Sequence, residues 1–100
     1  MHIKEFQELM RSLYYERDKK RGVARTFMWL CEEVGELSKA INRKNADKNK
    51  ENIGNEFADV FAWLCSLANI LEMDLEKYSL KKYDFKCPKC NSNPCICEFK

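Results

Sequence analysis

Four acidic residues form two pairs with the same spacing, and they are the part of the sequence best suited to chemistry. Glu33 and Glu36 lie three residues apart, and so do Glu56 and Asp59. On a helix, residues three apart are neighbours on one side, so each pair can direct its carboxylates at one point. Carboxylate oxygens with no histidine or thiolate nearby suit Mg²⁺ or Mn²⁺. We therefore predict a site for a hard cation between two helices.

A tryptophan accompanies each acidic pair. Trp29 precedes Glu33 by one helical turn, and Trp63 follows Asp59 by the same interval, so each indole lies on the side of its helix that carries the acids. Together these residues predict a pocket with a charged floor and aromatic walls on which a base could stack. Each tryptophan can also be read as core filling, and one acidic pair alone as exposed helix surface. Glu32 and Glu33 are our candidate catalytic residues, with Glu32 serving as a general base or an extra ligand.

Four helices should position these side chains. Apolar residues recur at helical spacing, and Asp74 is a good N-cap for the last helix. The expected helices span about residues 3–14, 23–43, 51–72 and 75–83. The charged residues 16–21, closed by Gly22, should form a basic connector, which is either a solvated loop or a cationic stretch that attracts a polyanion. The polar segment 42–52 should let the third helix return antiparallel to the second.

Apolar stripes on the second and third predicted helices mark the expected core, and the acidic pairs border these stripes. The stripe of the second helix consists of Phe27, Leu30, Val34, Leu37 and Ile41. That of the third helix consists of Ile53, Phe57, Val60, Leu64, Leu67 and Leu71. The second half of the third helix has hardly any polar face, which predicts a homodimer or homotetramer built through this helix. The alternative is a central helix that the protein's own other helices surround.

Composition excludes several function classes. With 100 residues the chain is expected to be one domain. Its 18 basic and 16 acidic residues give a net charge of +2 without an arginine-rich stripe, so we expect no nucleic-acid partner. We expect neither a signal peptide nor a membrane span, and hence a soluble cytoplasmic protein. Because His2 is the only histidine and no glycine-rich phosphate loop exists, histidine-dependent triads, zinc hydrolases and P-loop enzymes are excluded.

The segments EEVGE, residues 32–36, and EFAD, residues 56–59, carry a family resemblance. Their pattern on paired helices resembles the EExxE…ExxD signature of the MazG-like all-α nucleoside triphosphate pyrophosphohydrolases, and the similarity extends over about residues 24–83. The resemblance implies a short antiparallel helical bundle, assembled into dimers or tetramers. It also implies Mg²⁺-dependent hydrolysis of NTP or dNTP to monophosphate and pyrophosphate, which clears unwanted nucleotides from the pool. The implied Mg²⁺ ligands are Glu33, Glu36, Glu56 and Asp59.

Two substrate contacts also follow from this resemblance. In some relatives an aromatic residue matching Trp63 lies beside the nucleotide, and a lysine matching Lys82 faces the phosphates. Those relatives carry an asparagine four residues later, where this chain has Lys86. The substrate-binding candidates are therefore Trp29, Trp63 and Lys82.

Four of the six cysteines crowd into the C-terminal tail. Their pattern is CxxC followed after four residues by CxC, and four thiolates match the ligand number of a structural zinc site. A flexible tail of free or oxidised thiols is the alternative. We predict a helical domain over residues 1–85 and a zinc-knuckle-like tail over residues 86–100, with Cys31 and Cys65 as core fillers. The predicted zinc ligands are Cys87, Cys90, Cys95 and Cys97.

Two functions of different classes remain at this point. The first is a Mg²⁺-dependent nucleoside triphosphate pyrophosphohydrolase, with Mn²⁺ as the alternative ion. The second is a non-catalytic, zinc-bearing helical adaptor or a nucleic-acid-associated interaction protein. Four carboxylates at the edge of a core favour the enzyme, since an adaptor has no need of them.

Overall fold

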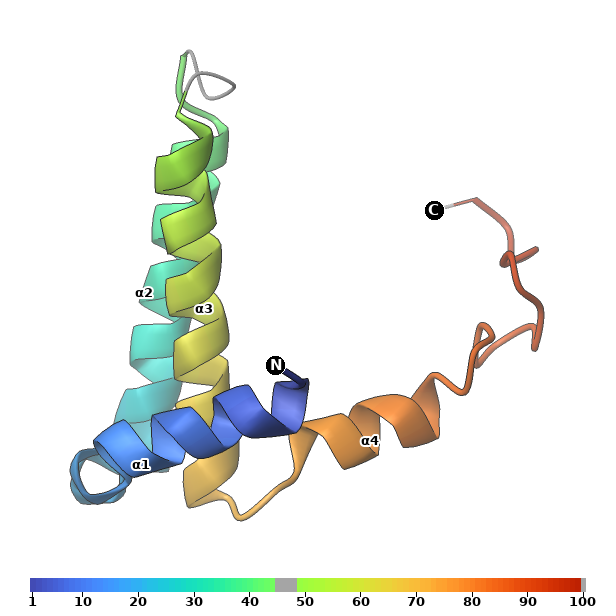
Figure 1. Ribbon diagram of the computed structural model, residues 1–100. Coiled ribbons are helices and arrows are strands. Elements are labelled where there is room, and N and C mark those ends of the chain that lie inside the picture. Colours follow the sequence, from blue (N-terminus) through green and yellow to red (C-terminus); the bar gives the residue numbers. More distant parts are fainter. Residues whose placement is uncertain (45–48, 100) are drawn as a thin grey trace.

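The computed structural model describes residues 1–44 and 49–99, and these residues form four helices and no strand (Figure 1). The helices are α1 (Ile3–Arg21), α2 (Val23–Ile41), α3 (Lys50–Ile70) and α4 (Leu75–Lys82). The bounds of α2, α3 and α4 lie within about two residues of the prediction, and Asp74 caps α4 by accepting a hydrogen bond from the Lys77 N–H at 3.1 Å. The all-α fold class is confirmed. Part of the connection expected at 42–52 lies outside the described residues.

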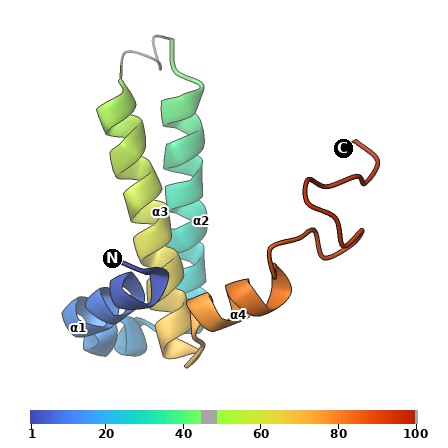
Figure 2. The same ribbon diagram turned by 45° about the vertical axis from the view of Figure 1, so that its right-hand side comes forward.

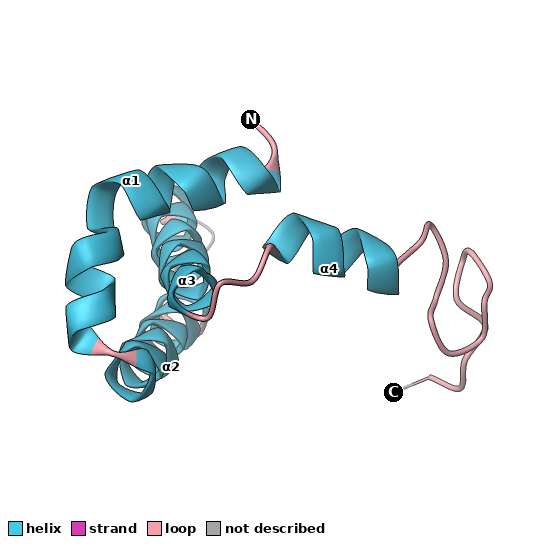
Figure 3. Cartoon of the chain, turned by 90° about the horizontal axis from the view of Figure 1, so that it is seen from below, coloured by secondary structure: helices cyan, strands magenta, loops and turns pink. Residues whose placement is uncertain are grey.

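The second and third helices form an antiparallel hairpin, and α1 crosses its base (Figures 1 and 2). Figure 3 shows α1 curving around the lower end of the hairpin, while α4 leads away from it. Phe6 of α1 stacks on Phe61 of α3, with ring centroids 5.0 Å apart. The hairpin therefore positions both acidic pairs, and α1 is held mainly against α3.

The first helix is longer than expected, because the charged segment 16–21 is helical and not a connector. Lys19, Lys20 and Arg21 occupy its last turn, where cations interact favourably with the helix dipole. The connection to α2 is Gly22 alone. Its φ of 89° lies in a region that glycine adopts readily and other residues avoid, so this glycine permits the sharp turn between the two helices.

The buried face of α2 is rotated relative to the predicted apolar stripe. Leu30 is buried, but Val34 and Ile41 are exposed, and Phe27 is 54% exposed. The buried residues of α2 are Thr26, Leu30 and Ala40. Glu33 is on the same side of the helix and is half-buried. The expectation that the whole stripe forms the core is wrong for the protomer, because the side of α2 that meets α3 carries polar and small residues as well as leucine.

The same holds for α3. Its buried residues are Cys65, Ser66, Ala68 and Asn69. Leu64 and Leu71 of the predicted stripe are exposed, and Phe57 is 56% exposed. Both hairpin helices thus present apolar side chains that the described part of the protomer leaves uncovered. Despite these side chains, no helix within residues 1–44 and 49–99 has the length and apolar character of a membrane span.

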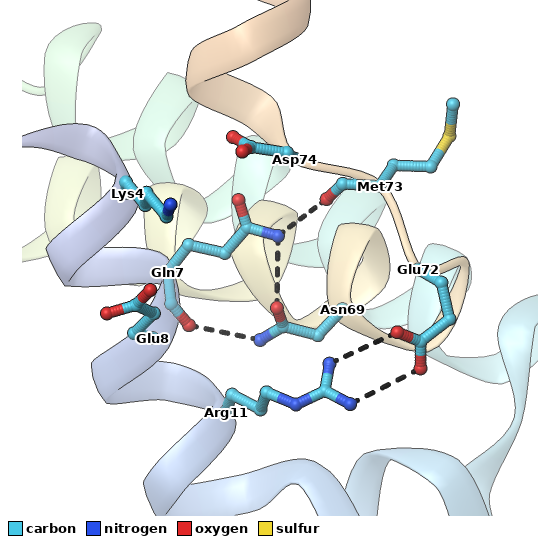
Figure 4. Close-up of a pocket in the computed structure, with 8 residues that line it drawn as sticks. All are labelled: Lys4, Gln7, Glu8, Arg11, Asn69, Glu72, Met73 and Asp74. Atoms are coloured by element: carbon cyan, nitrogen blue, oxygen red, sulfur yellow. Dashed lines mark hydrogen bonds and ion pairs between the residues drawn. The ribbon is translucent and has the colours of Figure 1, made fainter.

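A buried polar contact fixes α1 to the C-terminal end of α3 (Figure 4). The Gln7 side-chain amide donates to Asn69 Oδ1 at 3.0 Å and to the Met73 carbonyl at 2.7 Å. Asn69 Nδ2 donates back to the Gln7 carbonyl at 3.2 Å, and Gln7 Oε1 accepts from the Leu75 N–H at 3.0 Å. A cavity of about 250 Å³ lies here, but Gln7 and Asn69 satisfy each other, so we assign the contact a structural role.

The two cysteines outside the tail differ in burial. Cys65 is fully buried, as predicted, and burial raises the pKa of its thiol to about 11. Cys31 is exposed, so its prediction as a core filler is wrong. It follows Leu30 on α2 and therefore points away from the side that packs on α3.

Candidate functional site

Three of the four predicted acidic ligands converge between α2 and α3. Glu33 comes from the buried side of α2, while Glu56 and Asp59 lie one turn apart on α3. One carboxylate oxygen of each residue lies within 4.8 Å of those of the other two. The convergence follows from the antiparallel packing, since residues three apart on α3 share the side that meets α2. We call these three residues the acidic cluster.

Electrostatics disfavour three negative charges in the acidic cluster. Burial raises the pKa of Glu33, and four neighbouring carboxylates raise it further. They belong, in order of effect, to Asp59, Glu56, Glu36 and Glu32. Within the described residues, the ion pairs of the protein involve none of these acids. Oxygens that repel one another and lack a cationic partner fit a bound divalent cation.

Trp29 and Trp63 stack on each other, each one turn from a member of the acidic cluster. Their ring centroids lie 6.0 Å apart with an interplanar angle of 20°, and the Arg21 guanidinium carbon lies 4.7 Å from the centroid of Trp63. The sequence predicts two separate aromatic walls. In the structure the two indoles instead stack on each other, and the Arg21 guanidinium lies against Trp63. Their contact with a base stays a prediction.

A cavity of about 260 Å³ adjoins the acidic cluster, and Asp59 belongs to both. Trp63 forms part of its wall, and Arg17 and Arg21 of α1 bring positive charge to it. Asp18 is 2% exposed and its Oδ1 accepts from Arg21 Nη1 at 2.8 Å, whereas its Oδ2 has no hydrogen-bond partner within the described residues. Acidic, cationic and aromatic groups meet at one place, a combination suited to a phosphorylated ligand with a flat ring.

Comparison with known families agrees with this chemistry. The MazG nucleotide pyrophosphohydrolase domain matches residues 21–91. The chain belongs to the MazG family. The resemblance noted in the sequence is therefore confirmed, and the match includes the whole α2–α3 hairpin. It also continues past residue 85 into the tail, so the domain boundary at 85/86 stays a prediction. A search of curated proteins found no significant match.

Within this MazG domain, Glu36 lies outside the acidic cluster. It is exposed and shares a small cavity of about 110 Å³ with Glu56 and two basic residues. Glu36 is close enough to raise the pKa of Glu33, so it neighbours the three converging acids without joining them. Glu32 is exposed on α2, and its role as a base or ligand stays a prediction.

The structure does not bring Lys82 to the acidic cluster within one protomer. Lys82 ends α4, and α4 leads away from the MazG hairpin (Figures 1 and 3). Its ammonium lies 5.8 Å from the centroid of the Tyr83 ring. A contact between Lys82 and phosphates at this site would need a second protomer or a movement of α4, and it stays a prediction.

Sequence reasoning missed the contribution of α1 to the MazG site. Residues 16–21 are predicted as a connector, yet Arg17, Asp18 and Arg21 line the cavity from one face of a helix. The spacing holds a usable signal, because Asp18 and Arg21 are opposite charges three residues apart. Tyr14 continues the same helical period one turn earlier. These offsets favour an extension of the first helix over a loop.

The four tail cysteines form a second group of potential ligands. Their sulfur atoms all lie within 4.8 Å of one another. Hydrogen bonds from the backbone N–H groups of Ile96 and Ser92 lower the pKa of Cys90 to about 6. Hydrogen bonding with other sulfur atoms, that of Cys95 first, raises the pKa of Cys97 to about 12. We call Cys87, Cys90, Cys95 and Cys97 the tail cluster.

Proposed function

We propose that this MazG-family chain hydrolyses nucleoside or deoxynucleoside triphosphates to the monophosphate and pyrophosphate in a Mg²⁺-dependent reaction. The observation that supports this most is the convergence of Glu33, Glu56 and Asp59 beside a cavity with aromatic and cationic walls. Family membership supports a nucleotide substrate and a divalent metal in general terms. The acidic cluster and the cavity together supply a place for the phosphates and a place for the ring.

The donor set of the acidic cluster fits Mg²⁺. Glu33, Glu56 and Asp59 offer oxygen atoms only. Burial first, and then the neighbouring carboxylates, raise the pKa of Glu33, and a cation would neutralise the charge of those carboxylates. Glu36 is the proposed fourth ligand, and Mn²⁺ shares the preference for this donor set. When bound, the ion would offset charge on the phosphates and acidify a water molecule.

The chain's own side chains would bind and orient the substrate. Pockets that hold whole small molecules start at about 300 Å³, so a cavity of about 260 Å³ suits the nucleoside part, with the phosphates left beside the acidic cluster. Arg17 and Arg21 would attract the polyanion, and Trp63 with Trp29 would offer a surface for the base. Glu32, next to Glu33, is the proposed acceptor of the proton from the attacking water.

We also propose that the protein forms a homodimer or homotetramer. The exposed apolar side chains of α2 and α3, Phe27 and Phe57 above all, supply the surface. Burying such surface contributes roughly 25 cal/mol per Å², and a small helical protomer gains it only by association. In an assembly, α4 of one protomer can approach the acidic cluster of another, which would give Lys82 access to phosphates.

A cytoplasmic location completes the proposal. No disulfide joins the cysteines of the described residues, and a reducing compartment keeps thiols available as such or as metal ligands. Nucleoside triphosphates, the proposed substrates, occur in the same compartment. Cell fractionation followed by detection of the chain would test this, and recovery outside the cytoplasmic fraction would contradict it.

The function can be tested by measuring which phosphate product appears. The full chain is incubated with a panel of canonical and modified NTPs and dNTPs and Mg²⁺, and phosphate is assayed with and without added inorganic pyrophosphatase. We expect phosphate to appear only when pyrophosphatase is present, because the product is pyrophosphate. Glu56→Gln and Asp59→Asn should abolish turnover while helix content, measured by circular dichroism, is unchanged.

The matched control is Glu51→Gln. Glu51 is an exposed acid on α3, outside the acidic cluster, so this substitution should leave turnover unchanged. Absence of turnover on every nucleotide with Mg²⁺ and with Mn²⁺ would contradict the proposal and favour the non-catalytic adaptor. Direct release of orthophosphate would contradict the assigned bond cleavage.

A further inference from the structure

We propose that the tail cluster binds one zinc ion as a closed tetrathiolate site, separate from the active site. The sulfur atoms of Cys87 and Cys97 lie 3.7 Å apart, and those of Cys90 and Cys95 lie 3.9 Å apart. With Zn–S bonds of about 2.3 Å, a tetrahedral site places its sulfur atoms roughly 3.8 Å from one another. Two sulfur–sulfur distances of the tail cluster thus match a tetrahedral zinc site, and all four sulfur atoms lie within 4.8 Å of one another.

The backbone around the tail cluster supports thiolate ligands. The Ile96 N–H donates to Cys90 Sγ at 3.4 Å, and the Cys97 N–H donates to Cys95 Sγ at 3.3 Å. Such bonds place positive dipole ends against sulfur and favour its charged form. The first half of the tail is closed by hydrogen bonds from Asn91 N–H to the Cys87 carbonyl at 2.8 Å and from Cys87 N–H to the Ser92 carbonyl at 3.0 Å. The thiols are thus held by a defined turn.

Little besides a metal would keep this tail ordered. Its apolar side chains Phe85, Ile96 and Phe99 are 84%, 75% and 100% exposed. The tail follows α4 directly and stands away from α1, α2 and α3 (Figures 1 and 2). Ordering a chain segment costs conformational entropy that burial normally offsets, and burial is small here. In small metal sites, ligand binding and ordering of the chain are one event, so zinc would supply the missing stabilisation.

Zinc binding by the tail cluster is accompanied by the loss of protons from the thiols. Four thiols release four protons and bind one Zn²⁺ as thiolates, which leaves a net charge of −2 on the site. Lys86 and Lys89, both exposed and adjacent to ligands in the chain, can offset this charge. The electron count does not change, so no oxidant is required. The four cysteines carry no disulfide in the structure.

The proposed zinc site has a structural role. Four protein ligands leave no open position for water or substrate, unlike a catalytic zinc site. The site would fix the chain after α4 without taking part in phosphate chemistry. Chelation of the metal should therefore loosen residues 86–99 and leave the helix content of the protein unchanged.

Cobalt titration of the full, reduced chain tests the proposal directly. Co²⁺ reports its geometry by absorption, and we expect sulfur-to-cobalt charge-transfer and tetrahedral ligand-field bands that saturate at one equivalent and disappear when Zn²⁺ is added. Cys90→Ser should weaken Co²⁺ binding by at least about tenfold and remove the tetrathiolate spectrum. Cys31→Ser is the matched control, since Cys31 is an exposed cysteine outside the tail cluster, and it should behave like the native chain.

Several outcomes would overturn the assignment. They are a failure of the native chain to bind Co²⁺ while a thiol assay shows reduced cysteines, equal binding by the native chain and Cys90→Ser, or equal losses in Cys90→Ser and Cys31→Ser. Stoichiometric iron in place of zinc in the isolated protein, measured by elemental analysis, would overturn the choice of metal. None of these readouts depends on pyrophosphohydrolase activity, so the two proposals can fail independently.

Discussion

Glu33 on α2 and Asp59 on α3 hold carboxylate oxygens within 4.8 Å of each other across the hairpin. Two negative charges at this distance repel, and Asp59 contributes more than any other carboxylate to the raised pKa of Glu33. The metal-free protein therefore carries an electrostatic cost at its site. A cation that binds there removes this cost, so metal binding and protein stability should be linked.

The first prediction concerns the pH dependence of stability in the metal-free protein. Because the folded pKa of Glu33 lies above the ordinary value of 4.5, its contribution to stability is fully present below that value. The contribution is lost as the pH rises through the folded pKa. Glu33→Gln should therefore raise the melting temperature of the metal-free protein at neutral pH and leave it unchanged below the ordinary glutamate pKa. Thermal unfolding followed by circular dichroism measures both.

Magnesium should make the native chain more stable than Glu33→Gln, the reverse of the order expected without metal. At a concentration of 100 times its Kd, Mg²⁺ should stabilise the native chain by about 2.7 kcal/mol at neutral pH, and Glu33→Gln should gain far less. Glu51→Gln, on the exposed side of α3, should gain as much as the native chain. An equal gain for Glu33→Gln and the native chain would remove Glu33 from the metal site.

The helical period predicted the helices, but it did not predict how they are rotated. In α2 the strongest apolar stripe includes Phe27 and Val34, whereas the side that meets α3 includes Thr26 and Glu33. Periodicity shows which residues share a side of a helix and does not show which partner covers that side. When one side of a helix packs in the protomer and another side packs in an assembly, periodicity does not show which side does which. We infer that its more apolar side serves the assembly.

The site was predictable where its residues lie on one helix, and less so where three helices meet. The spacing of Glu56 and Asp59 on α3 predicted their convergence, and the same spacing of Glu33 and Glu36 predicted a partner pair on the neighbouring helix, of which Glu33 joins them. Arg21 reaches Trp63 only because α1 crosses the base of the hairpin, and that crossing depends on tertiary contacts far apart in the chain. Local spacing alone contains no information on such a contact.

The second prediction concerns the buried charge of Asp18. Asp18 is nearly inaccessible and its one ion pair within the described residues is with Arg21. Arg21→Ala leaves that carboxylate buried without a partner and should cost about 3 kcal/mol of unfolding free energy. Adding Asp18→Asn should recover much of the loss, because a neutral amide is easier to bury. Urea unfolding of both single variants and the double variant measures this, and strictly additive losses would count against the pairing.

The third prediction compares a buried and an exposed contact between α1 and the end of α3. Asn69→Ala removes the hydrogen bonds to the Gln7 side chain and backbone and leaves the Gln7 side-chain amide with the Met73 carbonyl as its acceptor, so it should cost about 2 kcal/mol. Arg11→Ala removes an exposed ion pair with Glu72 and should change the unfolding free energy little, since solvent screens such pairs. Urea unfolding measures both free energies. If Asn69→Ala loses no more unfolding free energy than Arg11→Ala, the contact between Gln7 and Asn69 in Figure 4 does not anchor α1.

The fourth prediction concerns assembly through the hairpin. Phe57→Glu places a charge among the exposed apolar side chains of α3, and burying that charge at an interface without a partner is unfavourable. We expect the native chain to have the mass of a dimer or tetramer by light scattering and Phe57→Glu to shift toward the monomer. The melting temperature should rise with protein concentration for the native chain and lose this dependence in the variant. Phe99→Glu removes a fully exposed phenylalanine from the tail and should leave the mass unchanged. A monomeric native chain would contradict the proposed assembly, and Lys82 could then reach the acidic cluster only by movement of α4.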